Sequence, residues 1–206
     1  MIKFSTKRAE RRATERIIEN ALKNLVIVDE NPSFSLVKSD LLSCGWDFIE
    51  EFGNMVEIGK NKYSAKKSPA LKFNDDVFNI TLIPHKNGIE LSRLEVYHPF
   101  RSYGVAGQFL LHFLIYLATK SITDIYLIPI PAGTSDIHDG TTLDINQLRN
   151  FYHKRGFVKQ DNDPYWKLNY DLFYRYLISA PVNPLVYEKL ISNILPKPPS
   201  SFSNCA

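Results

Sequence analysis

The sequence predicts a mixed α/β protein of the α+β kind, in which helices flank a mostly antiparallel sheet. Two β-rich runs joined by a short polar loop span residues 77–96. A strongly apolar helix pattern follows at 104–119, and a second helix pattern ends at Gly156, directly before another strand. With 206 residues, 44% of them hydrophobic, the chain is long enough to form one domain with its own core.

The N-terminal segment predicts an amphipathic helix. Apolar residues recur every four positions from Ala9 to Leu25, which is the spacing of one helix face. The helix is expected to begin near Ser5 or Thr6, because both are good N-cap residues, and to dock on the body of the protein.

The segment that follows gives weaker signals. Residues 25–28 are strand-like, and the Asn-Pro-Ser sequence at 31–33 predicts a turn. The stretch 36–52 is long enough for one or two short helices. Residues 60–72 are basic and predict a loop around Ser68-Pro69.

The central region predicts a hairpin, a buried helix and a strand. The runs 77–83 and 89–96 are separated by a loop that contains Asn87-Gly88, a strong hairpin signal. The helix at 104–119 is apolar on nearly every side and is therefore expected to lie in the interior. Residues 124–131 predict a buried strand.

The next part predicts a helix that ends sharply. The polar loop 133–142 is longer than most connections, and a loop of this length beside a site is expected to shape substrate access. Leu148, Phe151, Tyr152 and Arg155 then share one helix face, and Gly156 is the expected left-handed residue at the helix end. Strands are expected from Phe157 and, after the turn at 161–164, over 165–170.

These elements predict three parts. The first is a globular domain over residues 1–170 that includes the basic N-terminal helix. The second is a mostly helical extension over 171–195, broken at Pro181 and Pro184. Residues 196–206 are rich in Pro and Ser and are expected to form a disordered tail.

The bend between the strand at 89–96 and the helix at 104–119 predicts a phosphate site. The first N–H groups of a helix have no carbonyl partners, and the helix dipole places partial positive charge there. Gly104 and Gly107 allow close backbone approach, and Ala106 is nearly as small. Arg101 adds a cation with two-pronged geometry.

Two motifs give the chain a resemblance to the GNAT superfamily of N-acetyltransferases. The run 101–106, Arg-Ser-Tyr-Gly-Val-Ala, with Val96 and Pro99 before it, is similar to that family's Arg/Gln-x-x-Gly-x-Gly/Ala motif. The run 148–157 resembles the family's Phe-Tyr-x-x-x-Gly-Phe segment. The two motifs occur in the family's order, and the resemblance covers roughly residues 75–170.

The resemblance implies a fold, a cofactor and binding residues. It implies a sheet that splays open at its core strand, with coenzyme A wedged between residues 96 and 126. Backbone groups of Leu94 and Val96 would bind the pantetheine arm. The diphosphate would be cradled by the loop and helix start, which comprise Arg101, Ser102, Tyr103, Gly104, Val105 and Ala106.

The implied reaction is acetyl transfer from acetyl-CoA to a primary amine. Tyr152 matches the family's general acid, and a phenol stays protonated at neutral pH while being similar in strength to a thiol. The alternative is a core tyrosine on an aromatic helix face. Glu90 is the candidate general base, with two alternatives: an exposed charge at the sheet rim, or a water chain that takes the proton instead.

The chain departs from the family pattern at two positions. Many relatives have an asparagine seven residues before the tyrosine, where this chain has Ile145, with Asn146 one residue later. Asn146 is therefore given no role. The second small residue of the phosphate motif is Ala106 in place of glycine, which the family often tolerates.

Other functional classes lack their signatures. Asp136, His138 and Asp139 lack the spacing of a known metal site, so we expect a solvated loop and no metal. The Walker phosphate loop and the common hydrolase motifs do not occur. The other histidines, including His85 and His112, are expected to be surface or packing residues.

The chain is expected to be cytoplasmic. Its longest apolar stretch, 109–118, is about half of what crossing a bilayer requires, and Met1 to Ile18 lacks the apolar core of a secretory signal. Cys44 and Cys205 lie far apart, so no disulfide framework is expected.

A rival function rests on the N-terminal charge. Residues 1–23 hold seven basic and three acidic side chains, and Arg8, Arg12 and Arg16 share one helix face. An anionic partner, such as a nucleic acid or an acidic protein, would relieve that repulsion, although a solvated face is the plain alternative. The acceptor could then be an aminoacyl-tRNA, or the chain could be a binding module with vestigial or no transferase activity. A homodimer is also possible.

Overall fold

The computed structural model describes residues 31–52, 55–58, 61–64, 68–131, 143–161, 163–180 and 183–196. Several predicted segments lie outside these residues: the N-terminal helix, the strand at 25–28 and the loop at 133–142. Of the predicted tail at 196–206, the structure describes Pro196 alone. The predictions made for those segments therefore stay predictions.

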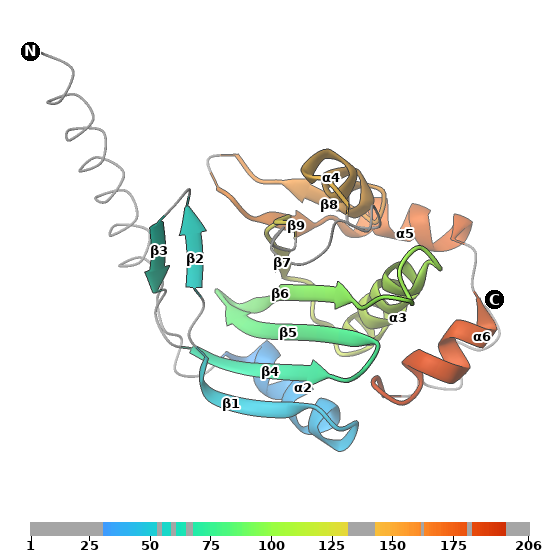
Figure 1. Ribbon diagram of the computed structural model, residues 1–206, viewed down its shortest axis with the longest axis horizontal. Coiled ribbons are helices and arrows are strands. Elements are labelled where there is room, and N and C mark those ends of the chain that lie inside the picture. Colours follow the sequence, from blue (N-terminus) through green and yellow to red (C-terminus); the bar gives the residue numbers. More distant parts are fainter. Residues whose placement is uncertain are drawn as a thin grey trace, which may run out of the picture.

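The chain folds around an open, mostly antiparallel sheet of seven strands, as the predicted fold class requires (Figure 1). The strand order is β1-β4-β5-β6-β7-β9-β8, and only β6 and β7 run parallel. The strands are β1 (Asp47–Phe52), β4 (Ser68–Asn74), β5 (Phe78–His85), β6 (Gly88–Val96), β7 (Ile125–Leu127), β8 (Phe157–Lys159) and β9 (Trp166–Leu168). A separate hairpin comprises β2 (Met55–Ile58) and β3 (Asn61–Ser64).

The β5–β6 hairpin agrees with the sequence prediction. His85 pairs with Gly88, so Lys86 and Asn87 form a two-residue turn, with Lys86 in the left-handed region at φ 50°. Gly88 is required for packing: a Cβ there would lie 1.7 Å from the carbonyl oxygen of Asp124. This close approach lets the Ile89 N–H donate to Asp124 and fixes the start of β6 beside β7.

The prediction of a turn at residues 31–33 is wrong. Asn31 is the N-cap of helix α2 (Pro32–Ser43), and its side chain accepts from the Phe34 N–H. Pro32 occupies the first helical turn, where its missing N–H costs nothing. Asn-Pro-Ser suits both a turn and a helix start, and burial of Phe34, Val37 and Leu41 decides for the helix.

Two further predictions in this region need correction. Residues 47–52 form strand β1 and not a helix, and much of the predicted loop at 60–72 is strand, as β3 and the first part of β4. β4 pairs with both β1 and β5, and its Ala70 and Leu71 are fully buried. The lysines that suggested a loop flank this short apolar pair.

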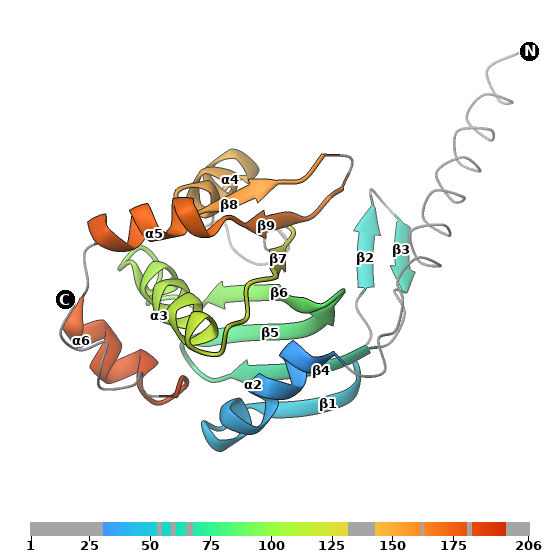
Figure 2. The ribbon, with the colours of Figure 1, turned by 180° about the vertical axis from the view of Figure 1, so that it is seen from behind.

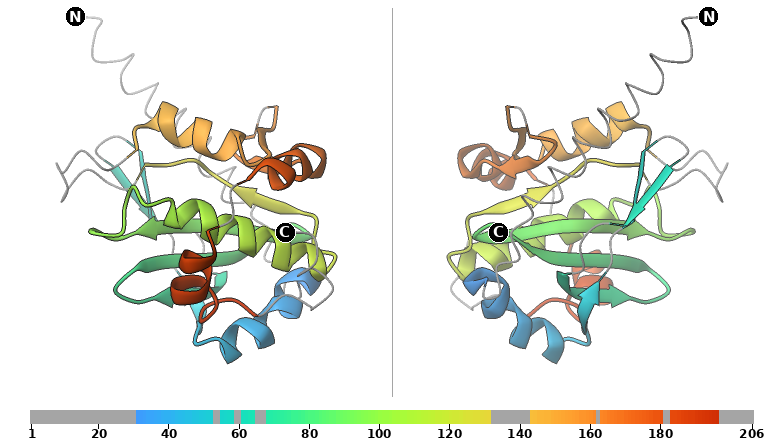
Figure 3. Two further views of the ribbon diagram at one scale, coloured as in Figure 1. Left: turned by 90° about the vertical axis from the view of Figure 1, so that its right-hand side faces the viewer. Right: turned by 90° about the vertical axis from the view of Figure 1, so that its left-hand side faces the viewer.

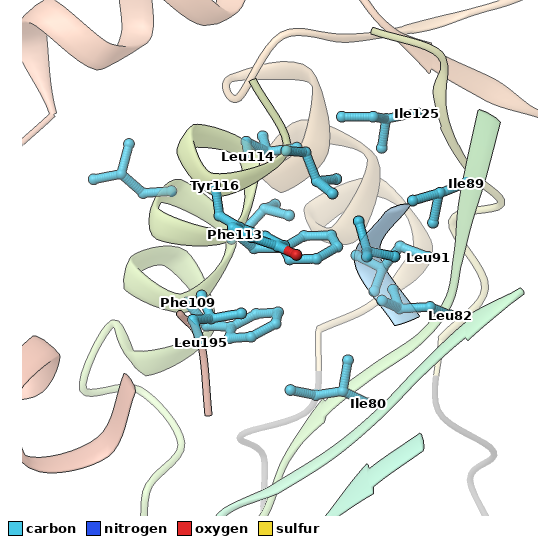
Figure 4. Close-up of a cluster of buried hydrophobic side chains, with 14 of the residues drawn as sticks. Ile80, Leu82, Ile89, Leu91, Phe109, Phe113, Leu114, Tyr116, Ile125 and Leu195 are labelled. Atoms are coloured by element: carbon cyan, nitrogen blue, oxygen red, sulfur yellow. The ribbon is translucent and has the colours of Figure 1, made fainter. Parts of the chain in front are cut away.

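Helix α3 (Val105–Thr119) supplies the centre of the core, as its apolar sequence predicts. Viewed from behind, α2 and α3 lie in front of the sheet (Figure 2). Phe109, Phe113 and Leu114 of α3 pack with side chains from β5, β6 and β7 (Figure 4). Tyr116 of α3 also donates to Asp40 of α2, which joins the two helices.

Strand β7 comprises three residues and is therefore shorter than the strand predicted at 124–131. The helix predicted to stop at Gly156 is present as α4 (Ile145–His153) and begins with a capping box between Asp144 and Gln147. Gly156 has φ 93°, and a Cβ there would lie 2.7 Å from the Phe173 backbone nitrogen. The strands predicted after Gly156 are present as β8 and β9, which pair antiparallel.

The C-terminal part is helical and packs on the core. It comprises α5 (Tyr170–Ser179), the short α6 (Pro184–Val186) and the π-helical turn η1 (Tyr187–Ile191). The views in Figures 1 and 3 agree that α6 and η1 lie beside α3. Ile191, Ile194 and Leu195 are buried, and Trp46 donates from Nε1 to the Ile194 carbonyl at 2.7 Å.

Candidate functional site

The sheet opens between β6 and β7. Only Ile89 with Ile125 and Glu90 with Tyr126 are in register across these parallel strands. Beyond Glu90, residues 91–96 of β6 have no strand partner on that side within the described chain. The other edge of β6 is paired with β5 along its length. An extended ligand could therefore bind backbone groups on the open side, where Leu94 and Val96 lie.

A β-bulge lies at the start of this open segment. Thr81 of β5 pairs with Arg93, whereas the next residue, Leu82, pairs with Leu91, so Ser92 is the extra residue. Bulges bend a strand and redirect its neighbouring groups, and they are frequent next to active sites. This bulge lies two residues beyond Glu90, where β6 leaves β7.

The loop between β6 and α3 is fixed by Arg101. The Arg101 Nε donates to the Val96 carbonyl at 2.7 Å, and Nη2 lies 3.6 Å from Glu95 Oε1. Its side chain is only 9% exposed. Arg101 thus holds the loop against the strand end while its positive charge stays at the base of the loop. Ser102, Tyr103 and Gly104 are exposed above it.

The N-terminus of α3 is open to an anion. The first helical hydrogen bond runs from Gln108 N to Gly104 O, so the N–H groups of Val105, Ala106 and Gly107 precede it. Gly104, the N-cap residue, has φ 75° and has no side chain to accept from them. By contrast, Asn31, Asp144 and Asn169 cap α2, α4 and α5. A Cβ on Gly104 would meet nothing within 4 Å, so space lies above this turn.

A second arginine, which the sequence did not suggest as a site residue, reaches the same turn. Arg155 follows α4, and its Nη2 lies 2.5 Å from where a Cβ on Gly107 would be. Its Nη1 donates to the Phe151 carbonyl at 2.8 Å, and its guanidinium lies 3.7 Å above the Phe151 ring. Burial lowers its pKa, which a hydrogen bond with Tyr176 opposes.

The position of Arg155 increases positive charge at one helix end. A cation near a helix N-terminus is unfavourable in isolation, because both carry positive charge. Its Nε is buried and has no hydrogen-bond partner among the described residues. The spatial pairing of Arg155 with Gly107 joins residues 48 positions apart, so no local sequence pattern could have identified it.

Tyr152 lies one helical turn before Arg155 and is buried at 7% exposure. Its ring packs edge-on against Phe151 and Phe157. Burial raises the pKa of Tyr152 to about 12, and the positive charge of Arg155 opposes that rise. The phenol is therefore fully protonated at neutral pH, which a general acid requires.

Glu90 does not lie at an exposed sheet rim, so that alternative is wrong. It is only 5% exposed, and its Oε2 is 3.5 Å from the Nδ1 of His85. Tyr165 makes a side-chain hydrogen bond with Glu90. Burial, followed by the negative charge of Glu90, raises the pKa of Tyr165, so this phenol stays a neutral donor.

The site residues predicted from sequence fall into two groups. The first group, Arg101 to Ala106, lies beyond the end of β6. Arg155 contacts Gly107 in the first turn of α3, and its charge also acts on Tyr152. Glu90 lies six residues before Val96, about 20 Å along the strand at about 3.3 Å per residue. Leu94 and Val96 lie between the two groups, on the strand whose other edge is open.

Comparisons with known proteins add no family assignment, since neither a scan against protein-family models nor a search of curated proteins gives a match. Within the residues that the structure describes, the helices are too short or too polar to span a bilayer. Asp136, His138 and Asp139 lie outside those residues.

Proposed function

We propose that this protein transfers an acetyl group from acetyl-CoA to a primary amine, as the resemblance to the GNAT superfamily implies. The observation that carries the proposal is the uncapped start of α3 at the end of the half-open strand β6. Three N–H groups, Arg101 and Arg155 put positive charge where a diphosphate would bind. The opening between β6 and β7 supports the splayed sheet of that family.

The residues present suit coenzyme A. The N–H groups of Val105, Ala106 and Gly107 would bind the diphosphate, and Gly104 leaves room above them. The open edge of β6 at Leu94 and Val96 would pair with the amides of the pantetheine arm, much as another strand would. When bound, the coenzyme supplies an acetyl thioester, whose carbonyl carbon is open to attack by an amine.

Protein groups would supply the proton transfers. Tyr152 would protonate the departing sulfur, since its phenol is protonated at neutral pH, although the raised pKa makes it a weaker acid than a free tyrosine. Glu90 would assist deprotonation of the amine where β6 separates from β7. The extended arm of the coenzyme along β6 would have to bring the thioester to a point that both Glu90 and the Tyr152 hydroxyl reach, since reacting atoms must lie about 3–3.5 Å apart.

The experiment is a thiol-release assay with a panel of amines. The wild-type protein is mixed with acetyl-CoA and, in turn, a polyamine, a lysine peptide, a peptide with a free N-terminus and an aminoacyl-tRNA. The proposal predicts amine-dependent release of coenzyme A with at least one of them. If acetyl-CoA fails to bind at millimolar concentration, the proposal is wrong.

The rival function makes a separate prediction. A nucleic-acid-directed protein should bind in a salt-dependent manner that weakens when Arg8, Arg12 and Arg16 are replaced with alanine. Unchanged binding in the triple variant would exclude this role for the N-terminal segment. We also propose a cytoplasmic location, on the sequence grounds given above.

A further inference from the structure

His85 and Glu90 form a buried acid and base pair at the point where β6 separates from β7. Both side chains are 7% exposed, and the His85 Nδ1 lies 3.5 Å from the Glu90 Oε2. Glu90 also belongs to the last pair in register with β7, opposite Tyr126. The pair is therefore at the closed end of the open edge that the pantetheine arm would occupy.

The surroundings of His85 are aromatic. The imidazole centroid lies 4.6 Å from the ring of Tyr126 on β7 and 4.1 Å from the ring of Tyr165, which precedes β9. Tyr165 in turn shares a hydrogen bond with Glu90. These rings fix the plane of the imidazole, and Nδ1 lies on the side of the carboxylate.

The nearby lysines are paired elsewhere. Lys86 Nζ lies 3.3 Å from Asp163, and Lys167 Nζ lies 2.6 Å from Asp124, although both are also near the Tyr126 ring. Within the described residues, the ion pair of Glu90 is with His85. A buried carboxylate needs polar partners, and His85 and Tyr165 are the side chains that face Glu90 here.

The outer nitrogen of His85 lacks a partner. Nε2 is buried and makes no hydrogen bond within the described chain, and the Glu90 Oε2 that faces Nδ1 makes none there either, so both atoms call for an explanation. When the neutral ring carries its proton on Nδ1, that proton faces Glu90 Oε2 across the 3.5 Å ion-pair distance, and Nε2 carries the lone pair. A carboxylate that holds one imidazole nitrogen while the other accepts a proton is the arrangement of a general base.

We propose that His85 is the general base of the reaction, and that Glu90 is a positioning residue that acts through it. The inference rests on the proposed acetyl transfer. The substrate class is a primary amine that arrives as an ammonium ion, for which a carboxylate and two aromatic rings form a suitable environment. One N–H bond of the ammonium breaks, and its proton bonds to Nε2 of His85. The electron pair stays on nitrogen, and the imidazolium later releases the proton to water.

The key variant is His85→Asn, because asparagine can keep a donor towards Glu90 but has no basic nitrogen. At pH 7 we expect kcat/KM to fall by about 10²-fold or more, as for other lost general bases, while stabilisation by acetyl-CoA stays unchanged. The deficit should shrink as the pH approaches about 10, where an alkyl amine is itself neutral. Added imidazole should partly restore the rate of His85→Ala.

Two controls separate this role from a structural one. His112→Asn removes a half-buried histidine of α3 whose Nε2 is also unpartnered within the described residues and which packs against Tyr187, and it should leave kcat/KM unchanged. Glu90→Gln should lower the rate less than His85→Asn and change the pH profile. A His85→Asn enzyme with the wild-type rate and pH profile would overturn the proposal, even though acetyl transfer itself would stand.

A measurement without turnover tests the same inference. Nitrogen NMR of the His85 ring should report the neutral tautomer with the proton on Nδ1, and Glu90→Gln should alter that signal. A neutral ring protonated on Nε2 would contradict the proposal. If the wild-type protein does not bind acetyl-CoA, the proposed function fails, and this tautomer is still measurable.

Discussion

The guanidinium of Arg155 occupies the space beside Gly107 that any larger residue would need, with Nη2 2.5 Å from an added Cβ. This contact brings the end of α4 against the first turn of α3. It thereby links Tyr152, the proposed acid, to the proposed diphosphate site. It also explains why a glycine, a poor helix former, lies within the first turn of a buried helix.

A double-mutant cycle tests this contact. Gly107→Ala should leave the stability of the wild type nearly unchanged, because displacing the end of the flexible Arg155 side chain offsets the gain in helix propensity. In the Arg155→Ala background the same change should stabilise by about 0.5–1 kcal/mol, the gain in helix propensity. Urea unfolding measures both. An equal effect in the two backgrounds would show that the two residues are not in contact.

Gly88→Ala should be among the most damaging small substitutions. Its Cβ would lie 1.7 Å from the Asp124 carbonyl oxygen, so β6 and β7 would have to separate. We expect a loss of more than about 3 kcal/mol, which is exceptional for a one-carbon change. The matched control is Gly45→Ala, where an added Cβ meets no atom within 4 Å. Alanine is disfavoured there only by the left-handed backbone at φ 83°, so we expect a loss of stability of about 1 kcal/mol. Similar losses at both positions would contradict the described strand contact.

Trp46→Phe should show that the C-terminal segment is part of the core. The substitution leaves the buried Ile194 carbonyl without the Nε1 donor at 2.7 Å, at a cost of about 1–3 kcal/mol. Trp166→Phe, at the half-buried position on β9, is the control and should cost less. Chemical unfolding followed by far-ultraviolet circular dichroism measures both. Equal losses would argue against an anchoring role for the indole N–H.

Stability should fall at alkaline pH. Burial raises the pKa of Tyr152 from its usual value near 10 to about 12, so the folded state favours the neutral phenol. Its contribution is complete below pH 10 and is lost as the pH rises towards 12, by at most about 1.4 kcal/mol per pH unit. Tyr152→Phe should show a shallower decline between pH 9 and 11 in urea unfolding. A decline parallel to wild type would show that Tyr152 does not contribute.

The parts of the fold that the sequence predicted correctly are those with strong local signals. Asn87-Gly88 between two β-rich runs, the apolar helix at 104–119 and the glycine after α4 each determine their structure within a few residues. The prediction failed at Asn31-Pro32-Ser33, since the same residues suit a turn and a helix cap. It also failed at β4, because the lysines near Ala70 and Leu71 suggested a loop where the chain forms an interior strand of the sheet.

In the candidate site, too, the features with a local sequence signal were predicted and the features that depend on distant contacts were not. The anion-binding bend is a local motif, so it was visible in the sequence. The placement of Arg155 against Gly107 depends on tertiary contacts. His85 and Glu90, by contrast, flank the predicted hairpin turn, and the register places them diagonally across the two strands, so the hairpin prediction implied that they are neighbours. The aromatic rings that orient His85 come from β7 and from the residue before β9, which only the folded sheet brings together.

The most direct test of the central claim is a thermal-shift titration of Gly104 variants with acetyl-CoA. Asparagine and aspartate both tolerate the left-handed backbone at this position, so Gly104→Asn and Gly104→Asp differ in charge alone. We predict that the coenzyme stabilises wild type and Gly104→Asn by an amount that rises with the logarithm of its concentration above Kd, and that it does not stabilise Gly104→Asp. Equal stabilisation of the two variants, or none in the wild type, would contradict a diphosphate bound at the start of α3.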